Sequence, residues 1–168
     1  GLSIATAAGC LLFGAISGSS QATLVAIGRP MFPELLQGGY KEKDALAVIT
    51  AACSLAMLIP PGTCMILYGV VTGTSIGNIF IAGILPGILV FILLAGYSFF
   101  VYGKLPRLPR ASLGDVFRVT KRALPTLGFP IIIMGGIYSG LLTPTEAAVA
   151  AVLYALILEM LLYRTINV

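Results

Sequence analysis

Residues 45–103 read ALAVITAACSLAMLIPPGTCMILYGVVTGTSIGNIFIAGILPGILVFILLAGYSFFVYG and contain no Asp, Glu, Lys or Arg. This charge-free run is long enough to cross a bilayer twice, because each helical crossing needs about 20 apolar residues. Backbone groups inside lipid must bond within the chain, which favours helices, and the alternation typical of barrel strands is absent. The sequence therefore predicts an all-α, polytopic helical membrane protein.

The composition of the rest of the chain agrees with this class. Hydrophobic residues make up 58% of the chain and charged residues 10%, whereas soluble domains are about 25% charged. The chain has no His, P-loop, GxGxxG or Gly-x-Ser-x-Gly motif, which argues against a zinc–histidine site, a Ser-His-Asp triad and an ATP-driven engine. The three cysteines all lie in apolar segments, and we expect them to be buried small hydrophobes rather than disulfide partners.

Turn and breaker residues divide the chain into four regions. The first region and the last both reach the ends of the chain within or soon after apolar segments, without an initiator Met, so we expect a piece of a longer membrane protein. The four predicted regions are a re-entrant helical hairpin (1–36), a broken helix with the following transmembrane span (37–102), a basic loop with an interfacial helix (103–122), and two transmembrane helices (123–168).

The basic loop predicts the orientation. It contains a single acid, Asp115, and six cations: Lys104, Arg107, Arg110, Arg118, Lys121 and Arg122. The positive-inside rule places such a loop in the cytoplasm, and the basic isoelectric point therefore gives no reason to expect nucleic-acid binding. Two spans separate this loop from residues 41–44, which are then cytoplasmic too. Ser112 resembles a helix N-cap, and the helix that follows is expected to lie in the membrane interface; a solvated connector is the alternative.

Two polar or helix-breaking stretches lie inside the apolar segments. The first, Ser17–Thr23 (SGSSQAT), places small hydroxyl residues at the turn of the hairpin, and the second, Pro60–Thr63 (PPGT), removes two N–H donors from a span. Irregular backbone at membrane depth is tolerated where it is buried or lines a cavity, and transporters use it to bind ions and substrates. The alternatives are a surface loop with serine caps and a plain proline kink. A third stretch, Thr143–Glu146, fits a structural capping box.

The chain resembles the large permease subunit of TRAP transporters, the DctM-like family. The similarity follows the family order along nearly the whole chain, in residues 13–23 (FGAISGSSQAT), 26–28 (AIG), 39–40 (GY), 58–61 (LIPP), 65–69 (MILYG), 73–77 (GTSIG), 81–87 (IAGILPG), 135–140 (GGIYSG) and 143–148 (TPTEAA).

The resemblance implies a fold and a mechanism. Such permeases are built from two inverted repeats, each with a hairpin and a broken helix, and work as sodium-driven elevators. They import organic anions such as dicarboxylates or sialic acids by symport across the bacterial or archaeal cytoplasmic (inner) membrane. Their partners are a small membrane subunit and a periplasmic substrate-binding protein. This chain would hold the first hairpin and broken helix and the connection toward the second repeat, so half of the substrate site would lie elsewhere.

The two helix-breaking stretches offer neutral oxygens suited to a hard cation, and with the sodium coupling that the resemblance implies they are the expected ion and substrate site. The expected set is Ser17, Gly18, Ser19, Ser20, Thr23, Pro60, Pro61, Gly62 and Thr63, with sodium held by Ser19, Ser20 and Thr23. The chain departs from the family at Gly62, where Ser is usual, so the backbone or Thr63 must substitute for that hydroxyl. A channel-type or other membrane subunit without sodium coupling is the alternative function. An enzyme would need acid–base residues within the spans, where only Glu146 and Glu159 are available.

Overall fold

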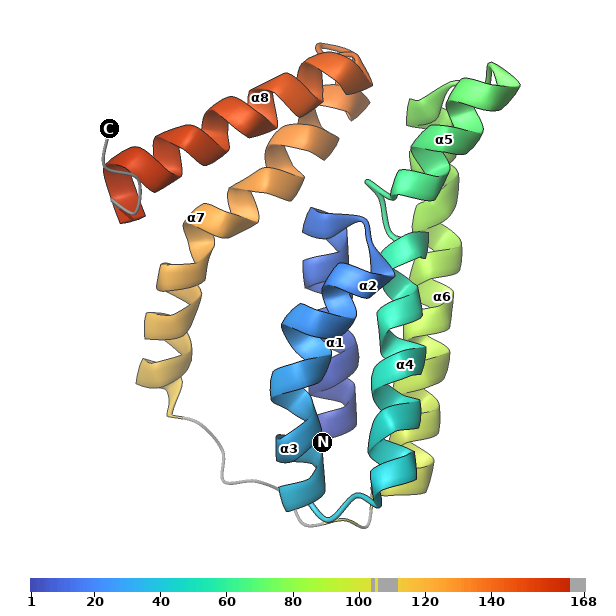
Figure 1. Ribbon diagram of the computed structural model, residues 1–168, viewed down its shortest axis with the longest axis vertical. Coiled ribbons are helices and arrows are strands. Elements are labelled where there is room, and N and C mark those ends of the chain that lie inside the picture. Colours follow the sequence, from blue (N-terminus) through green and yellow to red (C-terminus); the bar gives the residue numbers. More distant parts are fainter. Residues whose placement is uncertain (104, 106–111, 164–168) are drawn as a thin grey trace. The chain divides into compact units, whose positions relative to one another are not determined.

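The computed structural model describes residues 1–103, 105 and 112–163, and these residues contain no strand. They form two compact units, Gly1–Pro109 and Arg110–Val168, which are described in turn. The helices are α1 (Leu2–Ser17), α2 (Ser20–Thr23), α3 (Arg29–Gln37), α4 (Glu42–Leu58), α5 (Thr63–Thr72), α6 (Ile76–Tyr102), α7 (Leu113–Tyr138) and α8 (Pro144–Ile157), with π-helical turns η1 (Leu24–Gly28) and η2 (Leu158–Tyr163) (Figure 1).

The first unit begins with a helical hairpin. Helix α1 ends at Gly18, which has a left-handed backbone (φ 60°) and whose N–H donates to the Gly14 carbonyl at 2.8 Å. Glycine adopts this conformation without the Cβ penalty that other residues pay. Ser19 is extended and caps α2, and η1 and α3 continue the returning arm.

The rest of the unit is a broken helix and a long apolar helix. Helix α4 stops at Leu58, and α5 begins at Thr63 after the four residues that contain the double proline. A turn at Gly73 leads into α6, which runs beside α4 (Figure 1). The break lies where the sequence predicts it.

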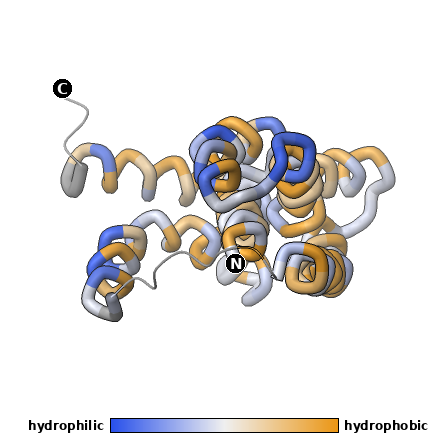
Figure 2. The backbone as a smooth tube through the Cα atoms, turned by 90° about the horizontal axis from the view of Figure 1, so that it is seen from below, coloured by the Kyte–Doolittle hydropathy of each residue, from blue (hydrophilic) through white to orange (hydrophobic). Residues whose placement is uncertain are grey.

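Much of the first unit's surface is apolar. Leu85 and Phe100 of α6 are 78% and 83% exposed. Among the described residues, Glu42–Thr72 and Ile76–Tyr102 are long and apolar enough to cross a membrane, judged by length and composition, and α1 is a shorter apolar helix. Figure 2 shows that the helices are mostly hydrophobic, with hydrophilic colour where α7 begins. Large exposed apolar surfaces of this kind suit contact with lipid or with another protein.

The core of the unit is the contact between α1 and α4, which lie side by side (Figure 1). Cys10 and Cys53 face each other across it, both buried, with their sulfur atoms 3.8 Å apart as free thiols. A Cβ atom at Gly14 would lie 2.6 Å from the Ala56 Cα, so the two backbones approach too closely for any side chain there. The prediction that all three cysteines are buried is wrong for Cys64, which is exposed, as are most residues of α5.

The second unit contains α7 and α8. The basic interfacial helix and the next apolar segment, predicted as separate elements divided at residue 122, form one helix, because Pro125 and Pro130 remove single hydrogen bonds without ending it. Most of the expected loop before Ser112 lies outside the described residues. The predicted capping box is confirmed: Glu146 accepts from the Thr143 N–H at 2.8 Å, and the Thr143 hydroxyl accepts from the Glu146 N–H at 3.3 Å.

Gly14→Ala in the intact permease is expected to lower the apparent melting temperature. Overpacking of a close contact costs about 1–3 kcal/mol, more than the ~0.5–1 kcal/mol that a helical glycine usually gains on replacement by alanine. Gly96→Ala in α6 is the matched control, because a Cβ at Gly96 meets no atom within 4 Å. Thermal unfolding of the purified protein in detergent measures both; equal or higher stability of Gly14→Ala would show that α1 and α4 do not pack this tightly.

Candidate functional site

The two helix breaks predicted to carry function meet in space. The Gly18 carbonyl, at the hairpin turn, accepts hydrogen bonds from both the backbone N–H and the hydroxyl of Thr63, each at 3.4 Å. A Cβ atom at Gly18 would overlap the Pro61 carbonyl oxygen and lie 3.4 Å from the Gly62 Cα. The turn and the double-proline break are therefore in direct contact, although Gly18 and Thr63 are 45 residues apart in the sequence.

A cluster of hydroxyl groups lies on the hairpin side of this contact. Thr23 is fully buried, and its hydroxyl donates to the Ser19 carbonyl at 2.8 Å. The Ser17 hydroxyl lies 3.3 Å from the Thr23 hydroxyl and 3.4 Å from the same Ser19 carbonyl. These oxygens form one connected group, held by the turn that Gly18 makes possible.

Ser19 and Ser20 have a second, structural role. The Ser19 hydroxyl accepts from the Ala22 N–H at 3.4 Å, so Ser19 is the N-cap of α2, as the alternative interpretation of the motif proposes. The hydroxyls of Ser19 and Ser20 both donate to the side-chain oxygen of Gln21, at 3.2 and 3.4 Å. Gln21 lies within the polar motif but is absent from the predicted set, and its position directly after two serines is the signal that could have included it.

The double-proline break adds backbone carbonyls from the other side. Pro60 and Pro61 carry no N–H, so the carbonyls of Ala56 and Met57 lose the donors that a continuous helix would supply. The Pro60–Pro61 peptide bond is cis, and Gly62 is buried, with the Met57 carbonyl oxygen 3.0 Å from where its Cβ would be. No side chain larger than glycine fits at residue 62 without displacing that carbonyl.

Thr63 is one of the groups that we expect to substitute for the missing serine hydroxyl. Gly62 is the N-cap of α5 and makes no side-chain cap, while the Thr63 hydroxyl reaches the Gly18 carbonyl. The position of Thr63 thus links the two breaks, with its side chain exposed at the edge of the contact.

The electrostatics of the site come from the backbone. The carbonyl ends of α1 and α4 and the N–H end of α5 converge on the contact, so negative and positive helix ends lie close together. Neither break contains a charged residue. In the part of the chain that the structure describes, no three His, Cys, Asp or Glu side chains are grouped to hold a metal ion. The oxygen atoms at the site belong to neutral hydroxyl and carbonyl groups, which are the ligands that hard cations prefer.

Comparisons with known proteins give the family that the chain resembles. Residues 1–168 match the family described as "Tripartite ATP-independent periplasmic transporter, DctM component". The ectoine/5-hydroxyectoine TRAP transporter large permease protein of Ruegeria pomeroyi is 52% identical over 169 residues, covering 99% of this chain and 40% of the relative.

Two further relatives give the same picture. The ectoine TRAP transporter large permease protein of Halomonas elongata is 48% identical over 100% of this chain and 40% of the relative. The C4-dicarboxylate TRAP transporter large permease protein of Pseudomonas aeruginosa is 40% identical over 98% of this chain and 39% of the relative. The chain therefore spans about two fifths of the length of the curated relatives that it matches.

Proposed function

Because the chain belongs to the DctM family of large permease components of TRAP transporters, we propose that it forms one half of a sodium-coupled site for importing small organic carboxylates. The observation that carries this proposal is the contact between the hairpin turn and the double-proline break, at which Thr63 donates to the Gly18 carbonyl. Family membership makes the chain part of a membrane transporter rather than an enzyme.

The proposed ion is sodium, and its ligands are the neutral oxygens of the two breaks. Carbonyls and hydroxyls at broken helices are the usual ligands for coupling cations in secondary transporters. Thr23, Ser17 and the Ser19 carbonyl supply three such oxygens within hydrogen-bonding distance of one another. Ser19 and Ser20 belong to the same motif, but their hydroxyls are engaged with Gln21, so we assign them a smaller share of the ion site than Thr23.

The proposed substrate is a carboxylate. The relatives at 52% and 48% identity are named for ectoine, and others are named for C4-dicarboxylates and sialic acid. All of these compounds carry at least one carboxylate group, which suits the N–H end of a broken helix. Ectoine is the first substrate to test, because the two most similar of these relatives share it. The remainder of the site would come from the part of the relatives' length that this chain does not span.

The proposed assembly follows from the family's tripartite name, and the proposed orientation follows from the positive-inside rule. The permease would act in the cytoplasmic membrane with a small membrane subunit and a periplasmic binding protein, and the residues 41–44 and 103–122 would face the cytoplasm. A channel-type subunit without sodium coupling remains the competing function.

Uptake into proteoliposomes separates the two functions. The intact permease, its small subunit and its binding protein are reconstituted, and uptake of labelled ectoine, a C4-dicarboxylate and sialic acid is compared with and without an inward sodium gradient. We expect accumulation of one of these carboxylates above its outside concentration, and only with the gradient. Equilibration without accumulation, at a rate indifferent to sodium, would instead identify a channel-type pathway.

A further inference from the structure

The first turns of α7 have two chemically different faces. Arg118, Lys121 and Arg122 are exposed and spaced three and four residues apart, which places them on one side of the helix. The apolar side chains of Val116, Phe117, Val119 and Leu124 are between 50% and 71% exposed. The helix therefore presents a basic face and an apolar face, and neither is covered by the second unit itself.

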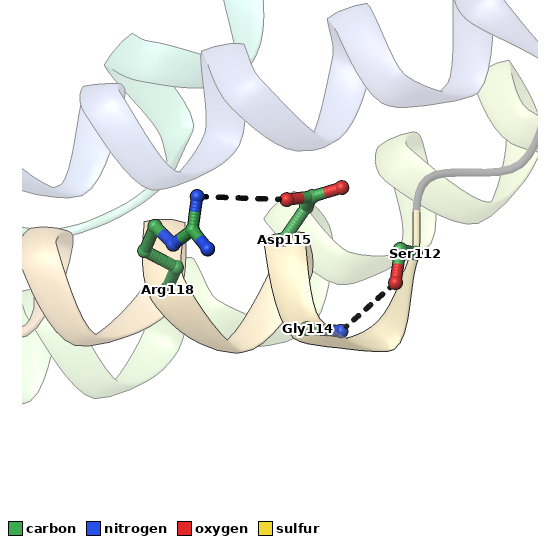
Figure 3. A network of polar contacts seen from close by, with 4 residues as sticks. All are labelled: Ser112, Gly114, Asp115 and Arg118. Carbon is green, nitrogen blue, oxygen red and sulfur yellow. Dashed lines mark hydrogen bonds and ion pairs between the residues drawn. The ribbon is translucent and has the colours of Figure 1, made fainter.

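The basic face keeps a positive charge. Asp115 is the single acid in α7, and its carboxylate lies 3.9 Å from the Arg118 guanidinium (Figure 3). Both side chains are well exposed, at 61% and 83%, so this ion pair is weak and does not neutralise the face. Ser112 caps the helix through the Gly114 N–H, which fixes where the basic turns begin.

The second half of α7 is uncharged and mostly apolar. Residues 125–138 contain no charged side chain, and Pro125 stands at the junction between the two halves. Proline is the usual cause of a helix bend, and Figure 1 shows the gold first half and the orange second half of α7 running in different directions. An amphipathic segment that bends into an apolar one has the arrangement expected where a chain leaves the membrane surface and enters it.

We propose that residues 114–124 bind the phosphate headgroups of anionic phospholipids, with the basic face on the phosphates and the apolar face among the upper acyl chains. This occupant is chosen because a phospholipid layer offers both partners at once: negative charge, and apolar chains below it. A soluble anion would leave Phe117 and Leu124 in water. The proposal concerns a surface separate from the two helix breaks, so it stands independently of sodium coupling.

A fluorescent probe on the apolar face tests the proposal. Phe117→Trp is introduced into the intact permease, because this chain has no tryptophan of its own; the signal of any other tryptophan is measured on the Phe117 parent and subtracted. The protein is placed in bilayers of phosphatidylcholine and phosphatidylglycerol, with bromine atoms on the acyl chains of one lipid or the other. The share of phosphatidylglycerol in the bilayer predicts how strongly its brominated form should quench. Quenching stronger than this value would show that the anionic lipid is enriched at α7.

We expect clear enrichment in the parent, and a fall on the order of 25-fold in relative affinity for Arg118→Gln with Arg122→Gln, since each basic residue near an anionic surface contributes roughly a fivefold preference. Arg118→Lys with Arg122→Lys should keep the enrichment, which separates charge from folding. Lys41→Gln with Lys43→Gln removes the same charge where α4 begins and should leave it unchanged. Equal quenching by the two lipids would overturn the proposal. An equal loss of enrichment in the Lys41→Gln, Lys43→Gln variant would also overturn it. So would no quenching by either lipid, which would mean that a protein partner covers this face.

Discussion

Gly18→Ala in the intact transporter is expected to reduce carboxylate uptake by at least about tenfold, the effect of ~1.4 kcal/mol lost from a binding equilibrium. Two costs combine at this residue. Alanine pays about 1–2 kcal/mol in the left-handed conformation that Gly18 adopts (φ 60°). Its Cβ would also overlap the Pro61 carbonyl oxygen, and the hairpin turn would have to move away from the double-proline break.

Gly73→Ala is the matched control for this experiment. Gly73 has nearly the same backbone conformation (φ 67°), but a Cβ there meets no atom within 4 Å. The control variant therefore has the unfavourable backbone conformation without the steric overlap. We expect it to keep most of its uptake activity and to melt at a somewhat lower temperature than the wild type. Initial rates in proteoliposomes, normalised to folded protein, measure both variants. If the two lose uptake equally, the contact between the breaks has no part in transport.

Thr23→Val should raise the sodium concentration needed for half-maximal uptake by about fivefold or more, since loss of a buried polar partner costs roughly 1–3 kcal/mol. Valine preserves the shape of the side chain and removes only the hydroxyl. That hydroxyl is fully buried and joins the Ser19 carbonyl to the Ser17 hydroxyl. The maximal rate at saturating sodium should change less, because the loss falls on ion binding.

Thr72→Val provides the same chemical change away from the breaks. The Thr72 hydroxyl donates to the Tyr68 carbonyl at 2.8 Å, the same kind of bond, to the carbonyl four residues back, that Thr23 makes. Its sodium dependence should equal that of the wild type. Ser19→Ala and Ser20→Ala should shift the dependence less than Thr23→Val. A Thr23→Val variant with unchanged sodium dependence would leave the hydroxyl cluster as a structural cap of the hairpin.

The sequence predicts the helices of the first unit because their signals are local. A charge-free run needs only lipid as its surroundings to become helical, and Gly18, Pro60 and Gly73 end or interrupt helices through their own backbone chemistry. The capping box at Thr143 and Glu146 is equally local and is confirmed. The candidate site residues were found in the same way, as polar or helix-breaking residues inside apolar segments.

The contact between the breaks could not be predicted from these residues alone. It depends on the packing of α1 against α4, which is decided by small residues such as Gly14 and Ala56. The chain contains 20 glycines, so a small residue in the sequence does not by itself indicate where two helices pack. The continuity of α7 was missed for a related reason. The change from basic to apolar composition near residue 122 indicates a change of environment along the chain. A helix ends only where its backbone hydrogen bonding stops, and the backbone stays helical through Pro125.

The close approach of Gly14 and Ala56 limits which substitutions this protein can accept during evolution. Growth of either residue would separate α1 from α4, and the same separation would draw Thr63 away from the Gly18 carbonyl, where the bonds are already 3.4 Å long. A larger residue at position 14 therefore needs a loss of volume at Ala56, and a larger residue at position 56 has no such compensation, because Gly14 carries no side chain. Positions 14, 18 and 56 should therefore change together or not at all, while the exposed apolar residues of α6 exchange freely with one another.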